Sequence, residues 1–256
     1  DTPMAPDSRS ATPSPGVTYE PAAGTLPRLR IDAVIPVYNE QHVLAGSVHT
    51  LREFLAEHMA GYDWRVVVAD NASVDGTLEV AQGLAEQHPG EVVCLHLDQK
   101  GRGRALRYAW LHSDADILSY MDVDLSTDIA FYPELIQAIV NGYDVATGSR
   151  LMAGSRTNRS PKREFISRSY NLLTKVSHFT RIQDMQCGFK AISRRAAQEL
   201  VPLVQNNEWF FDTELLLLAE KFGYRVKEFP VRWVEDPYTR DRKSTRLNSS
   251  HTDISR

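Results

Sequence analysis

The chain has 256 residues, of which 42% are hydrophobic and 24% charged, and its formal net charge is −4. This length and composition predict one sizeable globular domain, alone or with tails, and the acidic balance gives no reason to expect a nucleic-acid partner. Two cysteines, Cys94 and Cys187, are too few for a disulfide framework and favour a reducing, cytoplasmic environment. There is no run of about 18 apolar residues and no signal-peptide pattern, so we expect no membrane-spanning segment.

The two ends of the chain differ in character from its middle. Residues 1–27 are rich in Pro, Ser, Thr and Ala without apolar periodicity, which predicts disorder. From residue 238 onward the sequence resembles translated sequencing-adapter read-through, so we expect 238–256 to be a non-native tail. The folded domain is then expected at 28–237. On this interpretation the natural C-terminus is missing, together with any membrane-anchoring segment it carried.

Strand-like and helix-like segments alternate between these ends. Apolar, strand-like runs lie at 30–36, 64–70, 92–97, 117–121 and 145–149, and helix-like segments at 40–59, 76–88, 103–112 and 131–140. This alternation of strands and helices predicts an α/β fold in which a mostly parallel sheet is flanked by helices. Further along we expect a basic amphipathic helix at 163–180, a strand near 188–192, and helices near 193–201 and 211–222.

Acidic and polar side chains follow three of these predicted strands. Asp122 and Asp124 come directly after the apolar run 117–121, and the segments 34–40 and 70–77 end the two earlier strands. Ligands of such sheets bind outside the carboxyl ends of the strands. Two carboxylates at a strand end can hold Mg²⁺ or Mn²⁺, and the cation can hold a diphosphate, although such pairs also occur on ordinary solvated turns. Taken together, the three strand ends predict a nucleotide-diphosphate site.

The order of these motifs resembles the family 2 glycosyltransferases of GT-A (Rossmann-like) fold. Segments 148–150, 162–168, 184–190 and 209–214 narrow the resemblance to polyprenyl-phosphate or dolichyl-phosphate hexosyltransferases. The versions of 186–190 and 209–214 found here look closer to dolichyl-phosphate glucosyltransferases than to mannose synthases. The resemblance implies inverting, metal-dependent transfer of a hexose to polyprenyl or dolichyl phosphate at the cytoplasmic face of a membrane, with peripheral membrane contact. Glucose is the favoured hexose, and UDP-glucose is favoured over GDP-mannose as donor.

The resemblance also assigns nucleotide-binding residues. Pro36, Val37, Tyr38 and Glu40 lie where the family's nucleotide lies, and Asp70 accepts a hydrogen bond from the uracil or guanine base. Glu40 is equally suited to the first turn of a helix. Asp70 has a second interpretation as a cap of the next helix.

Asp75 fits that capping position better than Asp70. Lys100, in the basic Gly-containing segment 100–104, suits either phosphate contact or a solvated turn.

Residues of the second half are assigned to catalysis and to the acceptor. In the family, Asp122 and Asp124 bind the metal, and Arg150 and Arg163 contact phosphates. The other interpretation of the arginines is a basic helix face that docks on anionic lipid.

Five further residues are placed on the acceptor and sugar side by the same resemblance: Ser167, Arg168, Asp184, Gln186 and Asp212. For Asp212, which begins a predicted helix, complementing the helix dipole is the alternative.

Other functions remain open at this point. A glycosyltransferase that acts on a saccharide hydroxyl would need a carboxylate base, whereas a phosphate acceptor is already ionised at pH 7, and the sequence offers no clear extra base. Arg232-Trp233 resembles the Gln-x-x-Arg-Trp of processive synthases, but the Gln is absent and 229–233 reads as a strand. A non-catalytic nucleotide-sugar-binding domain is a further alternative. A nucleotidyltransferase would need a Gly-rich nucleotide loop, which residues 34–45 lack.

Overall fold

The computed structural model describes residues 28–158 and 179–234, together with 169, 171, 173–175 and 177. The predicted tails at 1–27 and 238–256 and most of the predicted helix at 163–180 lie outside the described residues. The described ranges contain two β-sheets and the helices that cover the larger one.

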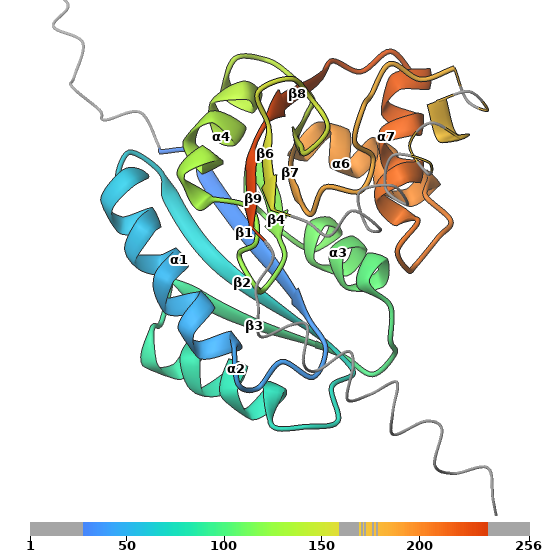
Figure 1. Ribbon diagram of the computed structural model, residues 1–256. Coiled ribbons are helices and arrows are strands. Elements are labelled where there is room, and N and C mark those ends of the chain that lie inside the picture. The colour runs from blue at the N-terminus through green and yellow to red at the C-terminus, as the bar shows by residue number, and fades with distance from the viewer. Residues whose placement is uncertain are drawn as a thin grey trace, which may run out of the picture.

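The centre of the molecule is a seven-stranded sheet with the strand order β3-β2-β1-β4-β7-β5-β8 (Figure 1). Its strands are β1 Arg30–Val37, β2 Asp63–Asn71, β3 Val92–Leu97, β4 Ile117–Met121, β5 Val145–Ser149, β7 Phe189–Ser193 and β8 Val226–Pro230. Strand β7 runs antiparallel to its neighbours β4 and β5, and every other neighbouring pair in this sheet is parallel. The predicted mostly parallel sheet is therefore confirmed.

Helices cover both faces of this sheet (Figure 1). They are α1 Leu44–His58, α2 Thr77–Gln87, α3 Arg102–Leu111, α4 Tyr132–Val140, α6 Arg194–Leu200 and α7 Phe211–Lys221, with 3₁₀ turns η1 Ile129–Phe131 and η2 Val201–Leu203. Side chains of a strand point alternately to its two faces, so β1 contributes to two cores. Ile31 and Ile35 pack in the core that includes α1 and α4, whereas Val34 packs in the core that includes α3, α6 and α7.

A small second sheet lies beside the main one. It pairs β6 Arg156–Asn158 in parallel with β9 Arg232–Val234. Strand β9 also binds the loop after β4, because Asp128 N donates to Arg232 O at 3.0 Å and Val234 N donates to Ser126 O at 2.9 Å. The predicted strand at 229–233 is thus split between β8 and β9. Strand β6 was not predicted, since three residues are too few to show a period of two.

Helix α3 packs closely on the start of α7, and this contact generates a stability prediction. A Cβ added at Gly103 would lie 2.6 Å from Phe211 Cβ and 2.9 Å from the carbonyl carbon of Asn207. We expect Gly103→Ala to lower the free energy of unfolding by about 1–3 kcal/mol through overpacking, measured by urea denaturation. Gly46→Ala is the matched control, because Gly46 is helical with no atom within 4 Å of the added Cβ. The control should be neutral or gain up to about 1 kcal/mol, and equal behaviour of the two variants would contradict this packing account.

Candidate active site

The register of the parallel strands brings the predicted motifs to one edge of the sheet. Val37, the last residue of β1, pairs with Asp70 of β2, and Asp70 pairs in turn with His96 of β3. On the other side of β1, strand β4 runs parallel and ends at Met121, directly before Asp122. The segments after β1, β2, β3 and β4 therefore leave the sheet at the same carboxyl edge, where α/β proteins bind their ligands.

Asp70 is a buried carboxylate with one oxygen paired and one unpaired. The side chain has no exposed surface, its Oδ2 lies 2.7 Å from His96 Nδ1, and its Oδ1 has no hydrogen-bond partner. The side chain that bonds to the start of α2 is that of Asp75, whose Oδ1 accepts from Thr77 N at 3.0 Å. Since an unpaired buried acceptor is costly, Asp70 Oδ1 suits a ligand N–H. Its contact with a nucleotide base stays a prediction.

The loops after β1 and β2 are tied to each other by side-chain-to-backbone bonds. Asn39 has a positive φ of 56°, its Oδ1 accepts from Val74 N at 2.9 Å, and its backbone N donates to Ser73 Oγ at 3.0 Å. Glu40 N likewise donates to Thr77 Oγ1 at 2.8 Å. These bonds fix the predicted nucleotide segment, which begins at Pro36, against the start of α2.

Lys100 and Tyr38 meet across the end of β2. Lys100 Nζ lies 3.7 Å from the centroid of the Tyr38 ring, and Gly101 N donates to Asn71 Oδ1 at 2.5 Å. Gly101 has φ 140°, which favours glycine. In this structure the Lys100 ammonium is therefore placed over an aromatic face, beside the predicted nucleotide segment.

Asp122 and Asp124 lie in the loop that leaves β4. Asp122 N donates to Gly188 O at 3.3 Å, and Asp124 Oδ1 accepts from Ser126 N at 3.0 Å. A Cβ at Gly188 would lie only 2.0 Å from Asp122 Oδ2, so the missing side chain of Gly188 makes the cradle for this carboxylate. The Asp122 side chain is 43% exposed and open to a ligand.

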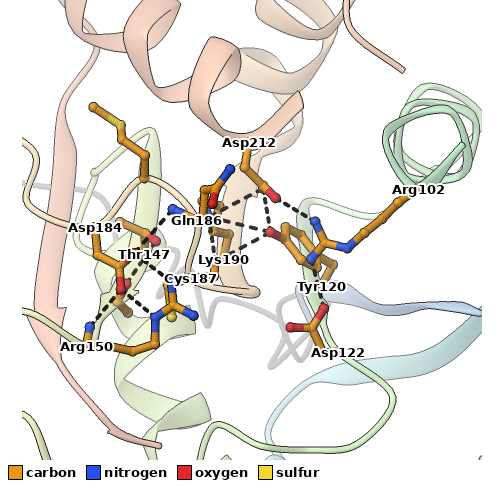
Figure 2. Close-up of polar contacts among 12 residues, drawn as sticks. Arg102, Tyr120, Asp122, Thr147, Arg150, Asp184, Gln186, Cys187, Lys190 and Asp212 are labelled. Atoms are coloured by element: carbon orange, nitrogen blue, oxygen red, sulfur yellow. Dashed lines mark hydrogen bonds and ion pairs between the residues drawn. The ribbon is translucent and has the colours of Figure 1, made fainter. Parts of the chain in front are cut away.

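A chain of alternating charges runs from Asp122 into the protein interior (Figure 2). Arg102 donates through Nη2 to Asp122 Oδ1 at 2.8 Å and through Nη1 to Asp212 Oδ2 at 2.6 Å. The other oxygen of Asp212 lies 3.3 Å from Lys190 Nζ and accepts a short hydrogen bond from the Tyr120 hydroxyl. We call Asp122, Arg102, Asp212 and Lys190 the charge chain.

Neighbouring opposite charges keep the Asp212 carboxylate ionised. Burial alone would raise the pKa of the Asp212 carboxyl, but the charges of Lys190 and Arg102 and the hydrogen bond from Tyr120 outweigh it, and the pKa is lowered. Burial and the nearby Asp212 raise the pKa of Tyr120, which stays a hydrogen-bond donor. Both Asp212 oxygens are thus engaged by donors, and the carboxylate is a poor proton acceptor.

Arg150 and Asp184, predicted separately, form a buried pair with each other (Figure 2). Arg150 donates to Asp184 through its backbone N at 3.0 Å, Nε at 2.6 Å and Nη2 at 2.8 Å. Burial alone would raise the pKa of Asp184, but the hydrogen bonds and charge of Arg150 lower it. Gln186 joins the pair, since its backbone N donates to Asp184 Oδ1 at 3.2 Å. The predicted contacts of these residues with phosphate and sugar stay predictions.

The remaining predicted acceptor residues, Arg163, Ser167 and Arg168, lie outside the described residues. Conversely, sequence reasoning assigned no site role to His96 or Tyr120. It placed Arg102 in the basic segment 100–104 and Gly188 and Lys190 in the segment 186–190, but not the contacts that these three residues make. Alignment of β2 with β3 would have pointed to His96, because it pairs with Asp70. The others gain their roles from contacts between distant segments, which local patterns do not reveal.

The donor set fits a divalent cation that arrives with a diphosphate. Within the described ranges, no group of three His, Cys, Asp or Glu side chains is placed to hold a metal ion alone. Mg²⁺ usually takes one or two carboxylates and completes its shell with waters and substrate phosphates. Asp122, seated in the Gly188 cradle, and Asp124 supply that number of carboxylates.

Comparisons with known proteins place the chain in a family. The model of "Glycosyl transferase family 2" matches residues 32–201, more than half of the chain, and the chain belongs to this family. It is 39% identical over 215 residues to "Glycosyltransferase AglD" of Haloferax volcanii, covering 83% of this chain and 34% of that protein. It is 31% identical to "Dolichyl-phosphate beta-glucosyltransferase ALG5C" of Trichomonas vaginalis, covering 79% and 63% respectively. The chain thus spans about a third to under two thirds of these relatives.

Solved structures share the fold. Glucosyl-3-phosphoglycerate synthase from Mycobacterium tuberculosis in complex with UDP superimposes with a TM-score of 0.60 at 18% identity, covering 81% of this chain and 72% of that one. A complex of the same enzyme with Mn²⁺, UDP and phosphoglyceric acid gives a TM-score of 0.59 at 15% identity, with 85% and 75% covered. These likenesses confirm the predicted GT-A class of fold. None of the helices in the described part of the chain is both long and apolar enough to cross a membrane.

The cradle at Gly188 generates a prediction about metal binding. In Gly188→Ala the new methyl group would displace the Asp122 carboxylate, so we expect Mn²⁺ to bind at least about tenfold more weakly in the presence of UDP, as for other changes that misorient a ligand. Electron paramagnetic resonance of free Mn²⁺ measures this affinity. Gly61→Ala, where a Cβ meets no atom within 4 Å, is the control and should bind as the parent does. An unchanged Mn²⁺ affinity in Gly188→Ala would exclude Asp122 as a ligand held by this cradle.

Proposed function

We propose that this protein transfers glucose from UDP-glucose to a polyprenyl or dolichyl phosphate in a reaction that depends on Mg²⁺ or Mn²⁺. Membership of family 2 and the names of the relatives support glycosyl transfer and a lipid-phosphate acceptor. The observation that carries the choice of acceptor is the engagement of Asp212 by Arg102, Lys190 and Tyr120.

A hydroxyl acceptor must lose its proton as it attacks, and this needs a base within reach. Asp212 is linked through Arg102 to Asp122, yet both its oxygens already accept from buried donors. Asp184 is occupied by Arg150, and Glu214 accepts from Gln205 N and Asn206 N at 2.9 Å each. The carboxylates of Asp212, Asp184 and Glu214 are therefore committed to structure, which favours an acceptor that arrives ionised.

A phosphate monoester is such an acceptor. Its oxygen attacks the anomeric carbon of glucose, the bond from that carbon to the UDP oxygen breaks, and the electron pair leaves with UDP. Direct displacement inverts the anomeric configuration. No proton moves in this step, so positioning and charge stabilisation supply the catalysis.

Each proposed role belongs to a named residue. Asp122 and Asp124 would hold the cation, which when bound stabilises the charge that develops on UDP. Arg150 and Arg163 would contact phosphate, with Ser167 and Arg168 on the acceptor side.

The nucleotide would lie along Pro36–Glu40 and Lys100, with its base at Asp70. Asp184, Gln186 and Asp212 would border the sugar. The lipid acceptor would place the enzyme at a membrane, and the family resemblance favours its cytoplasmic face.

The saccharide-hydroxyl alternative loses its main sequence support. Arg232 and Trp233 lie in β9, paired with β6 and with the loop after β4, and Arg232 forms an ion pair with Asp128. This dipeptide thus has a structural role in holding the loop that carries Asp122 and Asp124.

Donor specificity tests the proposal. We would incubate the protein with Mg²⁺, a polyprenyl monophosphate and one of UDP-glucose, GDP-mannose or UDP-N-acetylglucosamine, and analyse the lipids by mass spectrometry. The expected result is a hexosyl-phosphate lipid from UDP-glucose that disappears on addition of EDTA. A product from GDP-mannose alone would overturn the assignment of donor, and the absence of any lipid product would overturn the assignment of reaction.

A further inference from the structure

The contact between Asp70 and His96 has a consequence for which nucleotide the site accepts. Asp70 and His96 are paired residues of the neighbouring parallel strands β2 and β3. His96 Nδ1 lies 2.7 Å from Asp70 Oδ2, and because an ionised carboxylate only accepts hydrogen bonds, Nδ1 is the donor. His96 Nε2 lies on the far side, 3.3 Å from Asp98 Oδ1. One carboxylate oxygen of Asp70 is therefore occupied from within the protein.

The other oxygen is the only one that remains for a ligand. Asp70 Oδ1 is buried and has no hydrogen-bond partner, in a side chain with no exposed surface. The neighbouring Tyr38–Lys100 contact spans the end of β2, because Tyr38 follows β1 on one side and Lys100 follows β3 on the other. A base that reaches Asp70 would find a single unpaired acceptor.

Nucleobases differ in the number of donors that they present to such an acceptor. Uracil has one ring donor, N3–H, which lies between two carbonyl groups. Guanine has two adjacent donors, N1–H and the N2 amino group, which suit a carboxylate with both oxygens free. A guanine at Asp70 would leave one donor unpaired in a buried place, and sites reject ligands strongly when polar groups are left unpaired.

We propose that His96 sets the base specificity of the donor site by occupying Asp70 Oδ2, so that Asp70 accepts one hydrogen bond from uracil and disfavours guanine. The inference rests on the proposed function in so far as Asp70 faces the base of the sugar donor. His96 acts through Asp70 and is a positioning residue. Its effect is on the ratio of two affinities, which a purely structural role would leave unchanged.

Isothermal titration with free UDP and GDP in the presence of Mn²⁺, without acceptor, tests this directly. The parent protein should bind UDP more tightly than GDP. In His96→Ala neither oxygen of Asp70 has a hydrogen-bond partner in the protein, so the carboxylate can accept from both donors of guanine. We therefore expect the ratio of UDP to GDP affinity to fall by about tenfold or more. In His96→Asn the amide can still donate to Asp70 Oδ2, and the ratio should recover most of the parent value.

Asp98→Asn is the matched control, because Asp98 contacts the outer nitrogen of His96 and its side chain is 98% exposed. This variant should keep the parent ratio. A His96→Ala protein with an unchanged ratio, or a parent protein without preference for UDP, overturns the inference. Selective UDP binding that depends on His96 without any lipid product would overturn the proposed acceptor chemistry and leave this inference standing. A lipid product together with an unchanged affinity ratio in His96→Ala would overturn this inference and leave the proposed acceptor chemistry standing.

Discussion

The buried carboxylate of Asp212 holds together elements of the fold that are far apart in the sequence. Its partners come from three other elements: Arg102 begins α3, Tyr120 lies in β4, and Lys190 lies in β7. Asp212 and Lys190 are 2% and 1% exposed, and removing one member of such a pair typically costs about 3–5 kcal/mol because it leaves a buried charge unpaired. The antiparallel strand β7 and the helices α3 and α7 are therefore held in one arrangement around this point.

The same ion pairs connect the interior to the chemistry. Arg102 binds Asp212 with one nitrogen and Asp122 with another, so the loop after β4 is positioned by a group that is itself fixed in the interior. Gly188, next to the start of β7, provides the space for Asp122, and β9 binds the far end of the loop through Ser126 and Asp128. A site built in this way supplies fixed charges and, in Asp122, an exposed carboxylate that a cation with its diphosphate can reach. It supplies no free carboxylate base at Asp212, which suits an ionised acceptor.

The sequence predicts the scaffold well because apolar periodicity is a local property. The expected strand at 117–121 matches β4, and the expected helix at 211–222 matches α7 to within one residue. The acidic strand ends were recognisable because parallel strands share a carboxyl edge. The charge chain could not be recognised from the sequence, because the pairing of Arg102 with Asp212 joins residues that are 110 positions apart. Lys190 sits within an apolar strand and gives no local sign of its partner. The roles predicted for Arg163, Ser167 and Arg168 fall outside the described residues.

Competition between two acceptors shows whether the protein uses an ionised phosphate or a hydroxyl group. The protein would be given UDP-glucose, Mg²⁺ and an equimolar mixture of a polyprenyl monophosphate and the corresponding unphosphorylated polyprenol, with both products quantified by mass spectrometry. We expect a glucosyl-phosphate lipid and no glucosyl polyprenol, because the Asp212 carboxylate is engaged by Arg102, Lys190 and Tyr120 and is not free to take a hydroxyl proton. Transfer of glucose to the polyprenol, with little or none to the phosphate, would contradict this expectation.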